Sequence, residues 1–168
     1  HVVRADISKK DEVTASFSDF YLVFHCAAFP SPWGSFEKFY QANVIGTRNI
    51  VQACLENKVK RLVYVSTPSI YFDYNSRVNV KENDVLPEPI SHYAHTKSLA
   101  EEEVDKGFQN GLAVISIRPR ALFGEEDTVI FPRLLARLKS GRLPILEDGE
   151  NVVDLTYIQN VVDALLLC

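Results

Sequence analysis

Apolar and polar positions follow two different periods along this chain. Short runs rich in Val and Ile, at residues 21–29, 61–66 and 112–118, predict buried strands. Residues 35–56 and 91–109 instead carry apolar or small side chains at intervals of three and four, which predicts helices with one buried face. Strands that alternate with helices of this length favour right-handed crossovers and an α/β fold, a parallel sheet covered on both faces.

Weaker patterns extend this arrangement at both ends. Residues 1–6 predict another strand, residues 130–140 a short helix, and residues 152–158 a short strand that leads into a helix from Asn160. Open α/β sheets bind ligands beside the long loops that follow their strands, and such loops are predicted at residues 67–90 and 119–130.

Composition narrows the class of protein. The chain has 168 residues, 46% of them hydrophobic and 24% charged, with a net charge of −4. No basic run indicates nucleic acid, and no signal peptide or membrane span is visible. Cys26, Cys54 and Cys168 lack metal-ligand spacing, so we interpret them as reduced, buried thiols of a cytoplasmic protein without a metal site. Because the chain opens on His1 and contains no methionine, we interpret it as a piece of a longer protein.

A tyrosine and a lysine lie four positions apart in the segment SHYAHTKSLAEEE. Tyr93 and Lys97 share a helix face that continues through Ala100 and Val104, so both are expected to face inward. A phenol has a pKa near 10, and a nearby ammonium lowers it. Such a pair can exchange a proton at neutral pH, as hydride transfer to or from a carbonyl requires. The alternative is that Tyr93 only packs and Lys97 extends to solvent.

Two strand ends carry further candidates. Ser66 and Thr67 end a predicted strand, where a hydroxyl can bond a substrate oxygen beside the tyrosine or simply form a turn. Ala27 and Ala28 end another, where small residues admit a flat or diphosphate-bearing ligand or tight helix packing. His25 is interpreted as a core histidine without a catalytic role.

Four other positions break the local pattern. Asn43 falls on the apolar stripe of its helix, where its amide needs internal partners, and we expect it to tie a neighbouring strand or loop. Gly46 costs a helix about 1 kcal/mol relative to alanine, which indicates close approach to another element. Asp6 either caps a turn or accepts a hydrogen bond from an adenine amine. Trp33, in FPSPWGSF, either stacks on a ring of the ligand or caps the core.

Seven segments, taken together and in order, resemble the extended short-chain dehydrogenase/reductases. The closest resemblance is to the 3β-hydroxysteroid dehydrogenase and sterol-4α-carboxylate 3-dehydrogenase branch. The resemblance covers essentially the whole chain and is carried by RADIS, VFHCAAF, NVIGT, VSTPSIY, YAHTK, IRPRALFG and DGENVVDLTYIQNVVDA. It implies a Rossmann-like doubly wound sheet at residues 1–120, which binds NAD or NADP. Residues 121–168 would begin a small C-terminal substrate-binding portion that is not an independent domain.

One part of the family pattern is missing. The glycine-rich turn and the residue that reads the adenosine ribose are absent, so the first βαβ unit of the family is not in this sequence. The choice between NAD and NADP therefore stays open.

The resemblance also implies roles for individual residues. Tyr93 would be the acid/base, Lys97 would lower its pKa and hold the nicotinamide ribose, and Thr67 would orient the substrate oxygen. The implied cofactor contacts are Asp6 and Ile7 at the adenine, Cys26, Ala27 and Ala28 under the ribose and diphosphate, and Asn43, Ser66, Tyr93, Lys97 and Pro119 toward the nicotinamide side.

Three functions fit these residues. The resemblance implies an NAD(P)-dependent oxidoreductase that interconverts a secondary alcohol and a ketone on a steroid-like or other hydrophobic hydroxy compound. The first alternative is a nucleotide-sugar epimerase or dehydratase with the same site, although such enzymes usually carry an arginine where this chain has Thr156. The second is a non-catalytic NAD(P)-binding protein, against which the intact Thr67, Tyr93 and Lys97 argue.

The two long helices carry apolar residues beyond one stripe. On the first helix Val44, Val51 and Leu55 lie partly off the Asn43 stripe, and on the second Leu99 lies off the Tyr93 face. Relatives commonly pair these helices across a two-fold axis, so the resemblance implies a homodimer through residues 35–56 and 91–109. The alternative is that these side chains pack under neighbouring loops.

Overall fold

The computed structural model describes residues 1–128, 130–142, 149 and 152–168. It divides the chain into two compact units, unit 1 at His1–Arg118 and unit 2 at Pro119–Cys168. The assignment of a cofactor-binding part to residues 1–120 and a substrate-binding part to residues 121–168 stays a prediction. The first residues of the C-terminal motif, Asp148, Glu150 and Asn151, lie outside the described residues.

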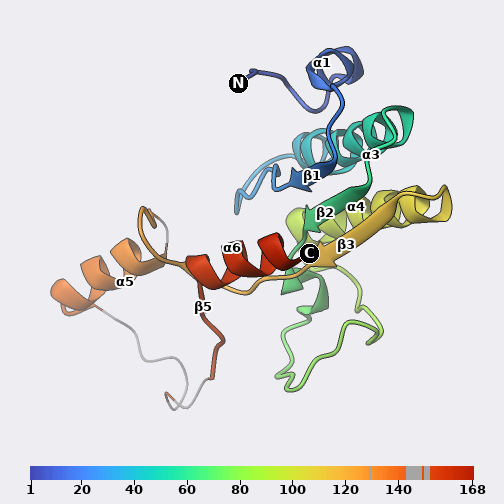
Figure 1. The fold of residues 1–168 in the computed structure, drawn as a ribbon. Helices are drawn as coiled ribbons and strands as arrows, with labels where there is room; N and C mark the ends of the chain where they lie inside the picture. The colour runs from blue at the N-terminus through green and yellow to red at the C-terminus, as the bar shows by residue number, and fades with distance from the viewer. Residues whose placement is uncertain (129, 143–148, 150–151) are drawn as a thin grey trace. The chain divides into compact units, whose positions relative to one another are not determined.

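A three-stranded parallel sheet forms the centre of unit 1 (Figure 1). Its strands are β1 (Leu22–His25), β2 (Arg61–Val65) and β3 (Ala113–Ile117), in the order β1-β2-β3. Both neighbouring pairs are parallel. The three predicted strands are therefore present, each shorter than its apolar run, because the residues after each strand leave the ladder.

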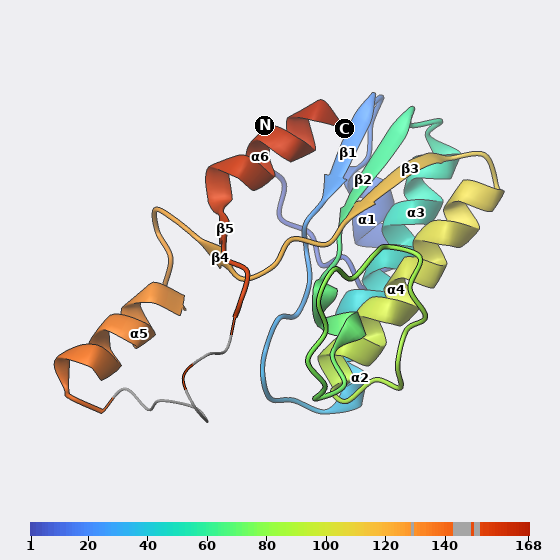
Figure 2. The ribbon, with the colours of Figure 1, turned by 90° about the horizontal axis from the view of Figure 1, so that it is seen from below.

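Helical segments connect these strands and pack on one face of the sheet (Figure 2). The predicted helix at residues 35–56 is a continuous helical segment with a wide π-helical turn at its centre, a feature that the sequence pattern did not predict. The predicted helix at residues 91–109 is present with almost the same bounds. The elements are α2 (Phe36–Phe39), the π-helix η1 (Tyr40–Ile45), α3 (Gly46–Glu56), the 3₁₀ turn η2 (Pro68–Tyr71) and α4 (His92–Gln109).

The core of unit 1 lies between the sheet and these helices. Leu62 and Tyr64 of β2 are completely buried there, as is Val104 of α4. Val51 of α3 packs so closely on α4 that a Cβ atom added at Gly107 would lie 2.7 Å from its Cγ1. Burying a large aliphatic side chain contributes about 1.5–3 kcal/mol, so this layer supplies most of the stabilisation of the unit.

This packing corrects part of the reasoning about a dimer. Val44 is 2% exposed and Val51 6% exposed, so both lie inside unit 1 and offer no outer surface. Leu55 is half-buried and also packs against this core, while Leu99 is half-buried on α4.

The expectation for the N-terminus is wrong. Residues 1–6 form no strand, because a strand needs a neighbour to pair its N–H and C=O groups, and among the described strands β1 pairs with β2 alone. A short helix that was not predicted follows, α1 (Lys10–Ser16), and its buried Val13 belongs to the core of unit 1.

Unit 2 is built around a short parallel pair of strands. Phe123 contacts the rings of Phe131 and Tyr157, with ring centroids 5.2 and 5.6 Å apart. The strand predicted at residues 152–158 is much shorter, and the following helix begins before Asn160. The elements are β4 (Leu122–Phe123), α5 (Ile130–Lys139), β5 (Thr156–Tyr157) and α6 (Ile158–Leu167). Within the described parts of both units, we find no helix with the length and apolar character that a bilayer crossing demands.

Candidate functional site

The Thr67 hydroxyl lies where β2 ends and the chain turns toward α4. Thr67 caps η2: its Oγ1 accepts a hydrogen bond from the backbone N–H of Ser69 at 3.2 Å and donates one to Ser69 Oγ at 3.0 Å. The turn interpretation is thus confirmed. The Thr67 hydroxyl is also near enough to the Tyr93 phenol to lower the pKa of that phenol, so the structure brings the two predicted residues together.

The helix start places Tyr93. Ser91 caps α4 by accepting a hydrogen bond from the N–H of Ala94 at 3.1 Å, which fixes the first turn and its half-buried Tyr93. Burial raises the pKa of Tyr93, and the nearby Thr67 hydroxyl offsets only part of that effect. The lowering of this pKa by Lys97 stays a prediction, since the shift seen in the structure comes mainly from desolvation of the phenolate.

The Lys97 side chain points inward, as predicted, and is 1% exposed. Its Nζ donates a hydrogen bond to the carbonyl oxygen of Val65 at 2.8 Å and lies 4.1 Å from the centre of the Tyr64 ring. Burial lowers the pKa of Lys97 to about 8, while the carboxylate of Glu101 acts in the opposite direction. The ammonium is thus held at the end of β2 and loses its proton at a mildly alkaline pH.

The amide of Asn43 joins the loop after β1 to α4. Its Oδ1 accepts a hydrogen bond from the N–H of Phe29 at 2.7 Å, and its Nδ2 donates one to Thr96 Oγ1 at 3.0 Å. This confirms the expectation that a 1% exposed amide on an apolar stripe ties a neighbouring backbone. Asn43 lies in the π-helical η1, and π turns are often found at functional sites.

His25 is a core residue, as predicted, and is 3% exposed. Its Nε2 lies 2.9 Å from Thr47 Oγ1, and that hydroxyl donates its proton to the carbonyl oxygen of Asn43 at 2.6 Å. The hydroxyl has a single proton, so His25 Nε2 must be the donor in the first contact. Burial, assisted by the charge of Lys97, lowers the pKa of His25 to about 3, which keeps the ring neutral.

Two features at the strand ends fit a bound nucleotide cofactor. Cys26 and Ala27, just after β1, are exposed and Ala28 is half-buried, so a flat group can reach this backbone. This corrects the expectation that Cys26 is buried. Ser66, after β2, is 5% exposed, and its Oγ finds no hydrogen-bond partner among the described residues. A buried hydroxyl is costly without a partner, and a ligand at this strand end would supply one.

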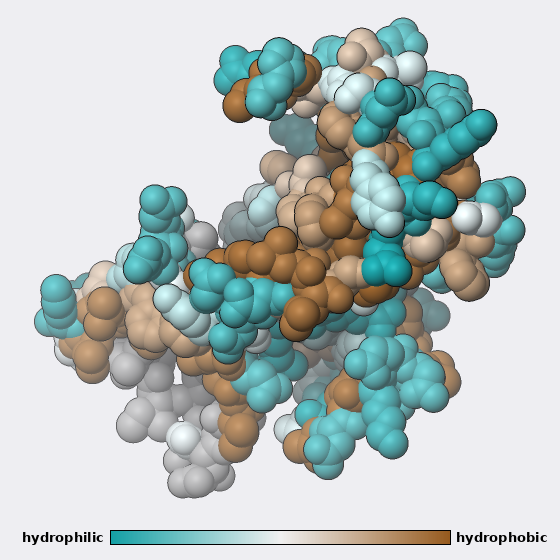
Figure 3. All heavy atoms as spheres, viewed as in Figure 1, coloured by the Kyte–Doolittle hydropathy of each residue, from teal (hydrophilic) through white to brown (hydrophobic). Residues whose placement is uncertain are grey.

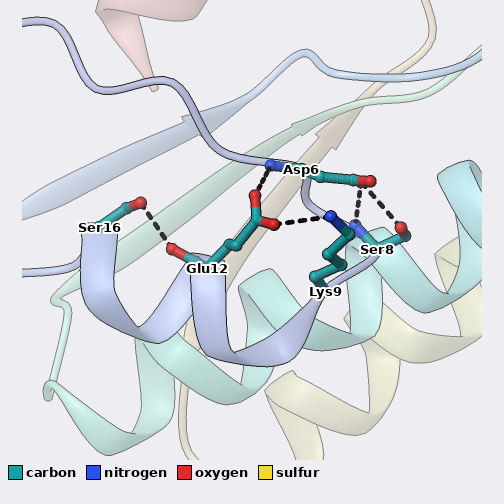
Figure 4. Close-up of polar contacts among 5 residues, drawn as sticks. All are labelled: Asp6, Ser8, Lys9, Glu12 and Ser16. Carbon is teal, nitrogen blue, oxygen red and sulfur yellow. Dashed lines mark hydrogen bonds and ion pairs between the residues drawn. The ribbon is translucent and has the colours of Figure 1, made fainter.

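Asp6 is held by the start of α1, where its backbone N–H donates a hydrogen bond to Glu12, and Ile7 packs on α3 (Figure 4 shows the contacts of Asp6). The Asp6 carboxylate accepts hydrogen bonds from the backbone N–H and the hydroxyl of Ser8, so it caps a turn, the first of its two predicted roles. The carbonyl of Ile7 accepts a bond from Asn49 Nδ2 at 2.9 Å. A Cβ atom added at Gly46 would lie 2.6 Å from Ile7 Cδ1, which confirms that Gly46 allows close approach.

Two candidates are not brought into this group. Pro119 belongs to unit 2, so its place beside the nicotinamide stays a prediction. Trp33 is 83% exposed and does not cap the core, which removes one of its two interpretations.

The sequence reasoning missed three residues that support the site. Tyr64 supplies the ring beside the Lys97 ammonium, and Glu101 pairs with Arg118 near the same lysine. Signals for them existed: Tyr64 lies two residues before Ser66 and so on the same face of β2, and Glu101 follows Lys97 by one helical turn.

Comparisons with known proteins agree with this geometry. The model of the 3-beta hydroxysteroid dehydrogenase/isomerase family matches residues 1–168. A 2-alkyl-3-oxoalkanoate reductase of Stenotrophomonas maltophilia (strain K279a) is 38% identical over 161 residues, which cover 94% of this chain and 49% of the reductase. A 3beta-hydroxysteroid-dehydrogenase/decarboxylase (isoform 2) of Arabidopsis thaliana is 38% identical over 168 residues, 96% of this chain and 29% of that protein.

A solved structure has the same fold. The UDP-glucuronic acid 4-epimerase from Bacillus cereus, crystallised with UDP-glucuronic acid and NAD, matches with a TM-score of 0.81 and 27% identity. The match covers 98% of this chain and 54% of the epimerase. This chain thus spans about half or less of the length of these relatives.

Proposed function

Because the chain belongs to the 3-beta hydroxysteroid dehydrogenase/isomerase family, we propose that the protein is an NAD(P)-dependent oxidoreductase of the extended short-chain type. It interconverts a secondary alcohol and a ketone on a steroid-like or other hydrophobic hydroxy compound. The observation that carries this proposal is the placement of Thr67 close to the Tyr93 phenol, with the buried ammonium of Lys97 one helical turn further along α4.

These residues provide the proton transfer that such a reaction needs. In the reducing direction, Tyr93 donates the phenol proton to the ketone oxygen while the Thr67 hydroxyl turns from Ser69 to hydrogen bond with the same oxygen. In the oxidising direction, the phenolate of Tyr93 takes the proton of the alcohol. The Lys97 ammonium favours the negative charge that develops on the phenol or on the substrate oxygen.

The residues around the strand ends fit the cofactor of the family. Bound NAD or NADP supplies or accepts the hydride. The segment from Cys26 to Ala28 would lie under its ribose and diphosphate, Ser66 would hydrogen bond on the nicotinamide side, and Asp6 and Ile7 would contact the adenine. Asn43 holds the first of these segments in place, as its bond to the Phe29 N–H indicates.

The proposed substrate class is supported by the relatives at 38% identity, named as a 2-alkyl-3-oxoalkanoate reductase and a 3beta-hydroxysteroid-dehydrogenase/decarboxylase. A nucleotide-sugar epimerase or dehydratase is the second candidate, favoured by the likeness to the UDP-glucuronic acid 4-epimerase. Thr156, where such enzymes usually carry an arginine, argues against it.

A turnover screen of the full-length protein separates these candidates. NAD and NADP are each paired with sterols and 3-hydroxy acids and, in parallel, with UDP- and dTDP-sugars. We expect nicotinamide reduction with the hydrophobic hydroxy compounds. Turnover of the sugar nucleotides alone would replace the proposal with its alternative, and cofactor binding without any turnover would indicate a non-catalytic protein.

The proposal includes a homodimer and a cytoplasmic enzyme. With Val44 and Val51 buried inside unit 1 and Leu55 packed against its core, the half-buried Leu99 on α4 is the residue left for such a contact. The three cysteines are all free, which suits a reducing compartment.

A further inference from the structure

A buried ion pair lies one helical turn beyond Lys97. Glu101 is 8% exposed, and its two carboxylate oxygens accept hydrogen bonds from Arg118 Nε at 2.8 Å and Nη2 at 2.5 Å. Such a two-point contact fixes both side chains, because the flat guanidinium matches the carboxylate only in one orientation.

The third nitrogen of Arg118 reaches the long loop between η2 and α4. Its Nη1 donates a hydrogen bond to the carbonyl oxygen of Glu82 at 3.2 Å and another to the hydroxyl of Tyr71. The Tyr71 hydroxyl in turn donates to the same Glu82 carbonyl at 3.1 Å, and the guanidinium lies 5.2 Å from the Tyr71 ring. Arg118 therefore joins the end of β3, the turn η2 and the middle of the loop.

This loop connects the two catalytic candidates. Residues 72–90 form no helix or strand, and they run between Thr67 with its turn and the start of α4 at Tyr93. Figure 3 shows polar and apolar side chains mixed on its surface. Its exposed apolar residues are Phe72, Tyr74, Val78, Val80, Val85, Leu86 and Ile90. A loop with so little apolar burial needs polar anchors to hold one conformation.

We propose that Glu101 is a positioning residue with two actions: through Arg118 it anchors the loop of residues 72–90 beside Thr67 and Tyr93, and through its charge it keeps the buried Lys97 ammonium protonated. The second action follows from its position on the same helix, one turn away, in a site where little solvent screens the interaction. The inference rests on the proposed function only for the use that the reaction makes of Lys97.

Other titratable and charged groups also face Lys97 and the Glu101–Arg118 pair. Around Lys97 these are Tyr64 of β2, His25 of β1 and Cys26 after it. Around the Glu101–Arg118 pair they are Tyr71, Glu82 and Asp84. His25 has a pKa of about 3 and stays neutral over the pH range of the titration, so it adds no charge beside Lys97. Glu101 is the carboxylate that acts on the Lys97 ammonium.

Two substitutions that break the same ion pair separate the two actions. Glu101→Gln removes a negative charge, so the pH at which Lys97 loses its proton should fall by about one unit. Arg118→Gln removes a positive charge and leaves the carboxylate, so that pH should stay or rise. A purely structural role for the pair would move both variants in the same direction. The measurement is an NMR titration of the Lys97 side-chain nitrogen in the full-length protein, assigned with Lys97→Met.

Amide hydrogen exchange tests the anchor. Both Glu101→Gln and Arg118→Gln should exchange the amides of residues 72–90 about tenfold faster than the parent. Glu102→Gln, on the exposed side of the same helix turn, is the matched control and should change neither the exchange nor the Lys97 titration. If Glu101→Gln fails to fold, Glu101→Asp replaces it: the shorter carboxylate should loosen the loop and leave the Lys97 titration where it is.

The proposal is overturned if Glu101→Gln leaves the Lys97 titration unchanged, if Arg118→Gln lowers its pH as well, or if loop exchange does not respond. If Glu101→Asp is used instead, a fall in the pH at which Lys97 loses its proton would also overturn the proposal. Neither measurement needs a substrate. A protein that passes both and shows no dehydrogenase turnover would remove the proposed function and leave this inference intact. With turnover, the alkaline limit of kcat/KM should move to lower pH in Glu101→Gln and not in Arg118→Gln.

Discussion

The phenol of Tyr93 is the group on which the proposed chemistry depends. Its raised pKa keeps it protonated at neutral pH, and the Thr67 hydroxyl lies close to it. Tyr93→Phe retains the ring and its packing and removes only the proton. We therefore expect turnover to fall by about 10²–10⁴-fold, the usual size of general acid–base assistance, with cofactor affinity almost unchanged. Steady-state kinetics and cofactor titration measure the two quantities.

Tyr21→Phe is the matched control, because Tyr21 is 76% exposed just before β1 and belongs to no part of the site. It should keep the activity of the parent. Full activity in Tyr93→Phe would require another proton donor.

The helical segment from α2 to α3 joins the pieces of the candidate site. Asn43 accepts a hydrogen bond from the partly buried N–H of Phe29 and donates a buried one to Thr96. Asn43→Ala leaves that N–H without its partner, so we expect the free energy of unfolding to fall by about 2 kcal/mol. Urea unfolding measures it. Gln41→Ala, which removes only an exposed contact with Glu37 on the same helical turn, should cost less than about 0.5 kcal/mol. Equal losses in both variants would contradict the role of Asn43.

Gly46 sets how closely Ile7 approaches the same helical segment. In Gly46→Ala the new methyl group would displace the Ile7 side chain, which lies 2.6 Å from the added atom. Alanine favours the helix by about 1 kcal/mol relative to glycine. The displacement of Ile7 opposes this gain, so the free energy of unfolding should change little. Cofactor affinity should fall several-fold, because the proposal places Ile7 at the adenine. Calorimetric titration with NAD and NADP checks this, with Ala53→Gly in α3 as a variant that alters the helix away from Ile7. Unchanged affinity would remove Ile7 from the cofactor contacts.

Assembly of the whole molecule depends on the surface that α3 and α4 leave open. Leu99 is half-buried on α4. At a two-fold contact, a glutamate in its place would face the same glutamate of the second copy of the chain, and the two negative charges would repel each other. Leu99→Glu should therefore convert a dimer to a monomer at tens of micromolar protein, as measured by light scattering. Leu138→Glu, the same change at a 58% exposed position of α5, is the control. A dimer that survives Leu99→Glu would use another surface.

Much of this protein could be predicted from local sequence pattern. Apolar period and helix capping residues depend on neighbours a few positions away, so the strands of unit 1 and the helices at residues 35–56 and 91–109 were predicted within a few residues. The inward face of Lys97 and the structural demands of Asn43 and Gly46 were predictable for the same reason. Lys97 and Asn43 are polar side chains on the apolar face of a helix, and Gly46 is a glycine inside one. Such exceptions to the local pattern can be recognised from the sequence alone.

Only the tertiary structure decided what each of these residues meets. The Tyr64 ring beside Lys97 and the Glu101–Arg118–Glu82 contact join residues far apart in sequence. The pKa of Tyr93 is raised because burial, which depends on the packing of several elements, disfavours the phenolate. The residues at 1–6 have the composition of a strand without a strand to pair with, and pairing is a property of the fold, since a backbone hydrogen bond in a sheet needs a partner from elsewhere in the chain.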